Sequence, residues 1–161
     1  MHVSFRPVTP ADQSFLWEIC YHAVHVPAGQ PPYPREIVYV PEISRYVRDW
    51  GQPDDLGLIA LNDGKPVGAT WLRLLTGENK GYGYVDASTP ELSMALLPEY
   101  RGKGIGSQLL ARLLAAAEPR YAAICLSVSR DNPAQRLYQR MGFKVVGEND
   151  SSFTMVKRWR S

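Results

Sequence analysis

Residues 91–114, ELSMALLPEYRGKGIGSQLLARLL, decide the fold of this chain. They open with a short apolar run, break at Pro98, pass through three glycines in five residues and continue into a helical pattern. A strand, a glycine loop and a helix in this order aim backbone N–H groups and the positive end of a helix at an anion. Because glycine lacks a Cβ, a phosphate can approach such a backbone closely. The stretch therefore predicts an anion-binding loop.

Length and composition predict a single soluble domain over residues 1–161. The chain is 45% hydrophobic and 21% charged, and its net charge of +2 is too small for the dense basic stripe typical of nucleic-acid binding. No apolar run reaches the roughly 18 residues of a membrane span, and the N-terminus lacks the core of a signal peptide. The two cysteines belong to no Cys/His cluster. We therefore expect no nucleic-acid partner, no membrane partner, no metal and a cytoplasmic location.

The spacing of apolar residues predicts alternating strands and helices. Helices are expected after Asp12, over 43–50, over 105–117 and after Asn132. Strands are expected at 3–8, 56–61, 66–75, 92–97, 122–128, 143–146 and 152–157. Hairpin turns such as residues 62–65 indicate antiparallel pairs, and the helix between the fourth and fifth strands implies one parallel crossover. The predicted fold class is α/β, with a mixed sheet and helices on both faces.

Three phosphate-binding motifs can be compared with the glycine loop. A nucleotide P-loop requires Lys followed by Ser or Thr after its last glycine, whereas Ser107 and Gln108 follow here. A dinucleotide fingerprint has the spacing G-x-G-x-x-G, whereas this loop has G-x-G-x-G and no strand-end acid about 20 residues later. The pattern Arg/Gln-x-x-Gly-x-Gly/Ala, between a strand and a helix, fits RGKGIG at every fixed position.

At these residues the chain resembles the GCN5-related N-acetyltransferases, the GNAT superfamily. The loop motif lies in PEYRGKGIGSQLL, and a second stretch, NPAQRLYQRMGFKVVG, resembles the later block of the family. In element order the resemblance covers nearly the whole chain. It implies the GNAT fold, a mostly antiparallel central sheet whose single parallel pair, the fourth and fifth strands, splays apart, with helices on both faces.

The resemblance also implies an acetyl-CoA site. The fourth strand of the family carries a bulge, and the N–H groups of Ala95, Leu96 and Leu97 are the candidates for binding pantetheine and polarising the thioester carbonyl. Asn132 is a helix N-cap by its own sequence, and the resemblance adds a contact to CoA. The pyrophosphate is expected on the loop backbone, formed by Arg101, Gly102, Lys103, Gly104, Ile105, Gly106 and Ser107.

Two side chains are candidates for the chemistry. Tyr138 occupies the general-acid position of the family and would protonate a departing thiolate, although helical periodicity alone describes it as a packed residue. Glu91 lies near the place where several members carry a catalytic carboxylate, and the alternative is an acid on the surface at the end of a strand. Tyr33, Tyr82 and Tyr84 lie in loops and are candidates for contact with the acceptor.

The predicted function is an acetyl-CoA-dependent N-acetyltransferase that moves the acetyl group directly to a primary amine within a ternary complex. The acceptor, a small molecule or a peptide, is left open. One alternative is a non-catalytic acyl-CoA-binding regulatory domain. Another is a nucleotide-binding α/β module, which the mismatched fingerprints oppose. Because family members often dimerise, the resemblance also allows a homodimer.

Overall fold

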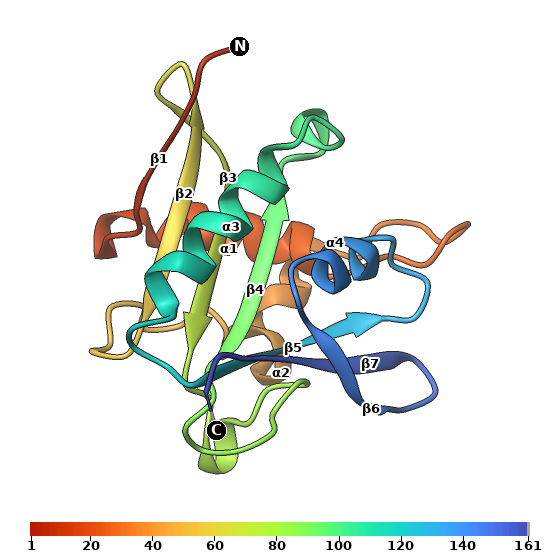
Figure 1. Cartoon of the computed structure of the whole chain (residues 1–161). Helices are drawn as coiled ribbons and strands as arrows, with labels where there is room; N and C mark the ends of the chain where they lie inside the picture. The colour runs from red at the N-terminus through yellow and green to blue at the C-terminus, as the bar shows by residue number, and fades with distance from the viewer. Residues whose placement is uncertain (161) are drawn as a thin grey trace.

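The computed structural model describes residues 1–160 and contains one seven-stranded sheet (Figure 1). The strand order in space is β1-β2-β3-β4-β5-β7-β6, and every neighbouring pair is antiparallel except β4 and β5, which are parallel. The predicted mixed sheet with one parallel pair is therefore confirmed. The strands are β1 (Val3–Pro7), β2 (Leu56–Asn62), β3 (Lys65–Arg73), β4 (Glu91–Leu96), β5 (Ala123–Ser129), β6 (Lys144–Glu148) and β7 (Ser152–Arg158).

Helices cover both faces of the sheet. On one face α1 packs on β4 and β3, and its Leu16 and Ile19 share an apolar cluster with the fully buried Trp71 of β3. On the other face α3 and α4 bury an apolar cluster that includes Leu110, Leu113 and residues of β5. The α-helices are α1 (Gln13–Ala23), α2 (Pro41–Ser44), α3 (Ile105–Ala117) and α4 (Ala134–Arg140), and short 3-10 turns occur at Pro10–Asp12, Arg35–Tyr39, Gly77–Asn79 and Pro98–Tyr100. Within residues 1–160, no helix is both long enough and apolar enough to cross a membrane.

The parallel strands β4 and β5 separate almost as soon as they meet. They share one residue pair, Glu91 with Cys125, and Figure 1 shows them pointing apart beyond it. On its other side β4 stays paired with β3, from Glu91 opposite Arg73 to Leu96 opposite Gly68, with no shift in register. The bulge expected on the fourth strand is therefore absent from this pairing. β4 therefore keeps its full pairing with β3 while it pairs with β5 at one position, and the two parallel strands splay apart.

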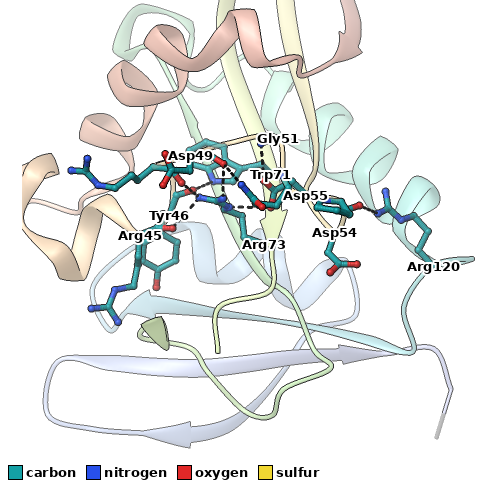
Figure 2. A network of polar contacts seen from close by, with 12 residues as sticks. Arg45, Tyr46, Asp49, Gly51, Asp54, Asp55, Trp71, Arg73 and Arg120 are labelled. Atoms are coloured by element: carbon teal, nitrogen blue, oxygen red, sulfur yellow. Dashed lines mark hydrogen bonds and ion pairs between the residues drawn. The ribbon is translucent and has the colours of Figure 1, made fainter. Parts of the chain in front are cut away.

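The helix expected over residues 43–50 was wrong, because α2 ends at Ser44 and turns continue to Asp49. The guanidinium of Arg73, at the end of β3, donates to the carbonyl oxygens of Arg45 (3.1 Å), Arg48 (2.7 Å) and Asp49 (3.3 Å) (Figure 2). These carbonyls are the groups that a longer helix would bond to its own N–H groups. The buried cation therefore replaces a turn of helix.

This Arg73 hub, defined as Arg73, Asp55 and the carbonyls of residues 45, 48 and 49, connects the segment between α2 and β2 to the end of β3. Arg73 is 6% exposed, and its Nε donates to the carboxylate of Asp55 at 3.0 Å. The same carboxylate accepts the N–H groups of Gly51 and Gln52, both at 2.9 Å. A buried charge is tolerated when it is paired and hydrogen-bonded in this way. The hub therefore holds residues 45–52 rigidly under the end of the sheet.

Candidate active site

The glycine loop (residues 101–107) offers a run of free donors at the start of α3. The N–H groups of residues 102–107 donate to no acceptor in the part of the chain that the structure describes. Gly102 and Gly104 have φ values of +74° and +83°, a region that side chains disfavour, and no atom lies within 4 Å of where their Cβ atoms would be. A strand–loop–helix junction with open, unpaired N–H groups is suited to an anion.

The opening between β4 and β5 exposes a second set of N–H groups. Leu97 donates its N–H to the carbonyl of Val67 at 2.8 Å, so this group is already occupied. Because antiparallel bonding alternates along a strand, the N–H of Ala95 also faces β3, whereas those of Leu96 and Met94 face the side that β5 has left. Of the three predicted residues, only Leu96 therefore offers a donor to the gap, and Met94 was missed.

The start of α4 combines a cap with a polar hollow. α4 begins at Ala134 with Pro133 as its N-cap, so Asn132, the expected cap, lies one residue before the cap position. Its Oδ1 nevertheless accepts the N–H of Ala134 at 2.9 Å, the bond that a cap makes to the first turn. A hollow of about 460 Å³ lies beside it, and Arg130 and Arg136 are among its lining residues. Since only Oδ1 is used by the cap, the Nδ2 of Asn132 is free to donate to a ligand.

Tyr138 of α4 lies in the apolar cluster that spans the two separated strands. It is 7% exposed, shares this cluster with Met94 of β4 and Leu126 of β5, and its ring packs edge-on against Phe143 at 5.7 Å between centroids. Burial raises the pKa of Tyr138 to about 12. Its hydroxyl donates to no acceptor among residues 1–160. The phenol therefore stays protonated and has a hydrogen bond to give.

Glu91, the first residue of β4, is buried rather than exposed at a strand end. It is 4% exposed, and its Oε2 accepts hydrogen bonds from the hydroxyl of Tyr46 (2.5 Å) and the N–H of Gly83 (3.1 Å). Its Oε1 is buried and has no partner among the described residues. Burial raises the pKa of Glu91, and the two hydrogen bonds oppose this rise. Because neighbouring residues of a strand point to opposite faces, Glu91 and the Leu92–Tyr138 cluster flank the gap from opposite sides.

The candidate acceptor tyrosines divide into two places. The tyrosine segment (residues 81–84, GYGY) lies against Glu91, with Tyr82 61% exposed and Tyr84 half-buried under the Lys80 ammonium at 4.6 Å. Tyr33 is 37% exposed in the loop after α1, where its carbonyl accepts the hydroxyl of Tyr21 at 2.6 Å. The structure therefore brings Tyr82 and Tyr84 to Glu91 and leaves Tyr33 near the end of α1.

Sequence reasoning missed Tyr46, which joins Glu91 to the tyrosine segment. In the sequence it lay within the helix expected over residues 43–50, and its hydroxyl was assigned no role. A buried tyrosine usually finds a partner for its hydroxyl, and that expectation was the available signal. No group of three His, Cys, Asp or Glu side chains within residues 1–160 is arranged to hold a metal ion.

The sequence model of the family described as "Acetyltransferase (GNAT) domain" matches residues 53–145, more than half of the chain. The chain belongs to the GNAT acetyltransferase family. The matched span of this GNAT domain contains Glu91, the glycine loop, Asn132 and Tyr138. The predicted family and the predicted acetyltransferase class are confirmed by this match. Among curated proteins, no sequence matches the chain.

Solved structures of acetyltransferases show the same fold. The PaiA N-acetyltransferase of Thermoplasma acidophilum, in complex with coenzyme A, superposes with a TM-score of 0.70 at 24% identity, covering 99% of this chain and 100% of its own. YncA of Salmonella typhimurium, a putative acetyltransferase with acetyl-CoA, gives 0.70 at 20% identity, covering 100% and 96%. The Escherichia coli ribosomal-protein-S18-alanine N-acetyltransferase gives 0.69 at 18% identity, covering 99% and 96%. At these identities the likeness is one of fold.

Proposed function

We propose that this GNAT protein is an acetyl-CoA-dependent N-acetyltransferase that transfers the acetyl group directly to a primary amine. The observation that carries the proposal is the run of free N–H groups in residues 102–107, beside the opening between β4 and β5. Two negative phosphates suit these donors and the exposed Arg101 and Lys103. PaiA and YncA, whose structures contain coenzyme A and acetyl-CoA, support the assignment. Acetyl-CoA supplies an activated acetyl thioester.

The rest of the donor is expected to follow β4. The free N–H groups of Leu96 and Met94 face the gap and are suited to the amide and carbonyl oxygens of a pantetheine arm. A backbone N–H aimed at a carbonyl that gains negative charge is worth about 3 kcal/mol to such a reaction. Asn132 can donate through Nδ2 from the far side, at the start of α4.

Tyr138 is the proposed donor to the leaving sulfur. When the amine nitrogen attacks the thioester carbon, the C–S bond breaks and its electron pair goes to sulfur. A thiol has a pKa of about 8.5, so full proton transfer from a phenol of pKa about 12 is uphill by roughly 5 kcal/mol. Tyr138 therefore acts chiefly by a hydrogen bond that strengthens as charge appears on sulfur, and solvent completes the protonation.

Glu91 is the proposed acceptor of the proton that the attacking amine must lose. Its carboxyl lies on the face opposite Tyr138, and Oε1 is its only oxygen without a partner in the described residues. Because burial raises its pKa, Glu91 is a stronger base than an exposed glutamate. The acid and the base would thus serve the gap from its two sides.

Direct transfer is favoured because neither thiol is prepared to act as a nucleophile. Cys20 and Cys125 are buried, and burial raises the pKa of Cys20 to about 12 and that of Cys125 further still. A cysteine attacks as its thiolate, which both environments suppress. Holding the donor and the amine together in one complex then supplies the main gain, through positioning.

The acceptor is proposed to bind beside the tyrosine segment, in contact with Tyr82 and Tyr84, whereas Tyr33 lies apart from them, near the end of α1. Tyrosine rings present an apolar body with a polar end, which suits either an aliphatic amine or a peptide N-terminus. The Escherichia coli neighbour, named for the alanine of a ribosomal protein, supports including peptides among the candidates.

Calorimetry and a free-thiol assay together test this function. We expect acetyl-CoA and CoA to bind and ATP not to bind, and we expect thiol release to depend on one class within a panel of polyamines, amino acids and peptides with free N-termini. Binding of ATP without CoA would refute the donor site. Binding of acetyl-CoA with no thiol release across the panel would instead indicate the non-catalytic acyl-CoA-binding alternative.

A further inference from the structure

The Glu91 carboxylate is held by two groups that are distant in sequence. Tyr46 follows α2, Gly83 lies in the connection between β3 and β4, and both donate to the same oxygen, Oε2. The charge of Arg45, beside Tyr46, opposes the rise in the pKa of Glu91, and the Glu91 carboxylate in turn helps raise the pKa of the Cys125 thiol on β5. Oε2 is therefore fully engaged, and Oε1 is the oxygen left to take a proton.

Tyr46 does more than donate to Glu91. Its hydroxyl oxygen also accepts the N–H of Tyr82 at 2.8 Å, so a single phenol bonds the carboxylate and the tyrosine segment. Tyr46 is 9% exposed, and a neutral phenol can donate one hydrogen bond and accept another at the same time. Burial and the neighbouring Glu91 raise the pKa of Tyr46 above its ordinary value, so the phenol keeps the proton that it donates.

Glycine at two positions allows the tyrosine segment to lie this close. A Cβ on Gly81 would overlap Oε1 of Glu91, and one on Gly83 would lie 2.6 Å from the carbonyl carbon of Leu126 in β5. Real side chains essentially never come so near. The backbone of the segment is thus packed between the start of β4 and the backbone of β5.

The backbone of Tyr46 is itself bonded to a side chain of β3. Its carbonyl accepts the indole N–H of the fully buried Trp71 at 2.8 Å, and the Arg73 hub bonds the carbonyl of the preceding residue, Arg45 (Figure 2). Its backbone therefore has little freedom, and the position of its hydroxyl is set by the sheet. A movement of the tyrosine segment must break its bonds to Tyr46 and Glu91.

We propose that Tyr46 is a positioning residue, whose hydroxyl orients the Glu91 carboxylate and ties the tyrosine segment to it as a preformed wall of the acceptor site. This inference rests on the proposed function. Two consequences follow. Loss of the hydroxyl removes a donor from Glu91, which destabilises its ionised form, and it frees the N–H of Tyr82, which loosens the wall.

The test is Tyr46→Phe, with Tyr121→Phe as the matched control. Tyr121 is also 9% exposed, and its hydroxyl donates to a backbone carbonyl, that of Asp54, at 2.6 Å, away from Glu91. In the holoenzyme we expect Y46F to raise the acceptor KM about tenfold, because the N–H of Tyr82 loses its acceptor and the wall of the acceptor site loosens. The KM for acetyl-CoA should stay unchanged, and the acid limb of kcat/KM should move to higher pH. Y121F should match the wild type in all three.

A second measurement needs no turnover. Hydrogen exchange should be faster at the amides of Tyr82 and Gly83 in Y46F and unchanged in Y121F. If Y46F exchanges at the wild-type rate, or has the acceptor KM and pH profile of Y121F, the positioning role is overturned. If the wild type itself releases no thiol while Y46F still loosens these amides, the proposed function fails and the structural link stands.

Two further variants keep the inference testable. Glu91→Gln retains oxygen and shape, so it should lower kcat while leaving the acceptor KM near that of the wild type. Gly81→Ala should raise the acceptor KM as Y46F does, because its Cβ pushes the segment away from Glu91. If Y46F does not fold, a wild-type acceptor KM in G81A contradicts the proposal.

Discussion

The two ends of β4 carry the two halves of the proposed site, and they are built in opposite ways. At its end, the glycine loop leaves residues 101–104 exposed and six consecutive N–H groups, those of residues 102–107, without a partner among residues 1–160. At its start, the Glu91 cluster, made of Glu91, Tyr46 and the tyrosine segment, buries a carboxylate whose two hydrogen-bond partners, Tyr46 and Gly83, come from two separate parts of the chain. The loop at the end of β4 presents N–H donors to solvent, whereas the carboxylate at its start is hydrogen-bonded within the protein.

Glycine shows the difference most clearly. Gly102 and Gly104 serve the loop through positive φ angles, with open space where a side chain would stand. Gly81 and Gly83 serve the Glu91 cluster by letting backbones touch other atoms. The donor side is therefore a local structure that many sequences of this motif can form. The proposed acceptor side depends instead on close contacts between residues that are distant in sequence.

The largest expected effect comes from the support of the Glu91 cluster. Arg73→Leu should lower the free energy of unfolding by about 3–5 kcal/mol, because it leaves the buried carboxylate of Asp55 unpaired. Arg130→Leu breaks an exposed ion pair with Glu148 and should cost about 0.2–1 kcal/mol. Urea unfolding at pH 7 measures both. Equal losses would show that the hub is no more important than a surface ion pair.

Tyr138→Phe changes a side chain that packs against the middle of β4, between the glycine loop and the Glu91 cluster. We expect kcat to fall about a hundredfold, because the hydrogen bond to the leaving sulfur is lost while the ring still packs on Phe143. The KM for acetyl-CoA and the melting temperature should hardly change. Pre-steady-state thiol release measures the chemical step directly, and a wild-type rate in that step would remove Tyr138 from the reaction.

The glycine loop is tested by Gly104→Val. A β-branched residue at φ +83° costs about 1–2 kcal/mol in backbone strain, so the loop should change shape and CoA should bind about tenfold more weakly. Gly64→Val is the control, since Gly64 has φ +81° and equally open surroundings in the β2–β3 hairpin. Calorimetry with CoA should show weaker binding in G104V alone. Equal CoA affinities in the two folded variants would contradict the assignment of the loop.

The smallest effect is a dependence of stability on pH. The pKa of Glu91 is raised in the folded protein, so the wild type loses stability as pH rises from the ordinary value of 4.5 through the folded value. Glu91→Gln lacks this titration, and its stability relative to the wild type should improve from pH 4 to pH 8 in thermal melts.

Asp12→Asn should show the opposite dependence of stability on pH, because the pKa of Asp12 is lowered in the folded protein. A hydrogen bond from Arg6 lowers the pKa of Asp12 from 3.8 to about 2, so the wild type gains stability above that range and loses it as pH falls through it. D12N should therefore be less stable than the wild type at pH 7 and equal to it near pH 2. If Glu91→Gln, like D12N, becomes less stable relative to the wild type as pH rises, the pKa of Glu91 is not raised by burial.

Most of the fold could be predicted because its signals are local. The predicted helix from Ile105 to Ala117 is a helix at those bounds, and the turn at Asp63–Gly64 joins β2 and β3. Asn132, expected to be the cap of α4, bonds the first N–H of this helix from one residue before the cap position. The helix over residues 43–50 failed for a reason that no local pattern contains. Its carbonyls are taken by Arg73, a residue more than 20 positions later in the chain.

The candidate site shows the same contrast between local signals and contacts across the sheet. The sequence by itself determined the glycine loop, because three closely spaced glycines between a strand and a helix impose free N–H groups wherever that unit folds. Only the tertiary structure decided which N–H groups of β4 are free, since Leu97 donates to Val67 across the sheet. It also decided that Glu91 is buried and bonded to Tyr46, because contacts between residues 45 positions apart exist only once the sheet has brought them together.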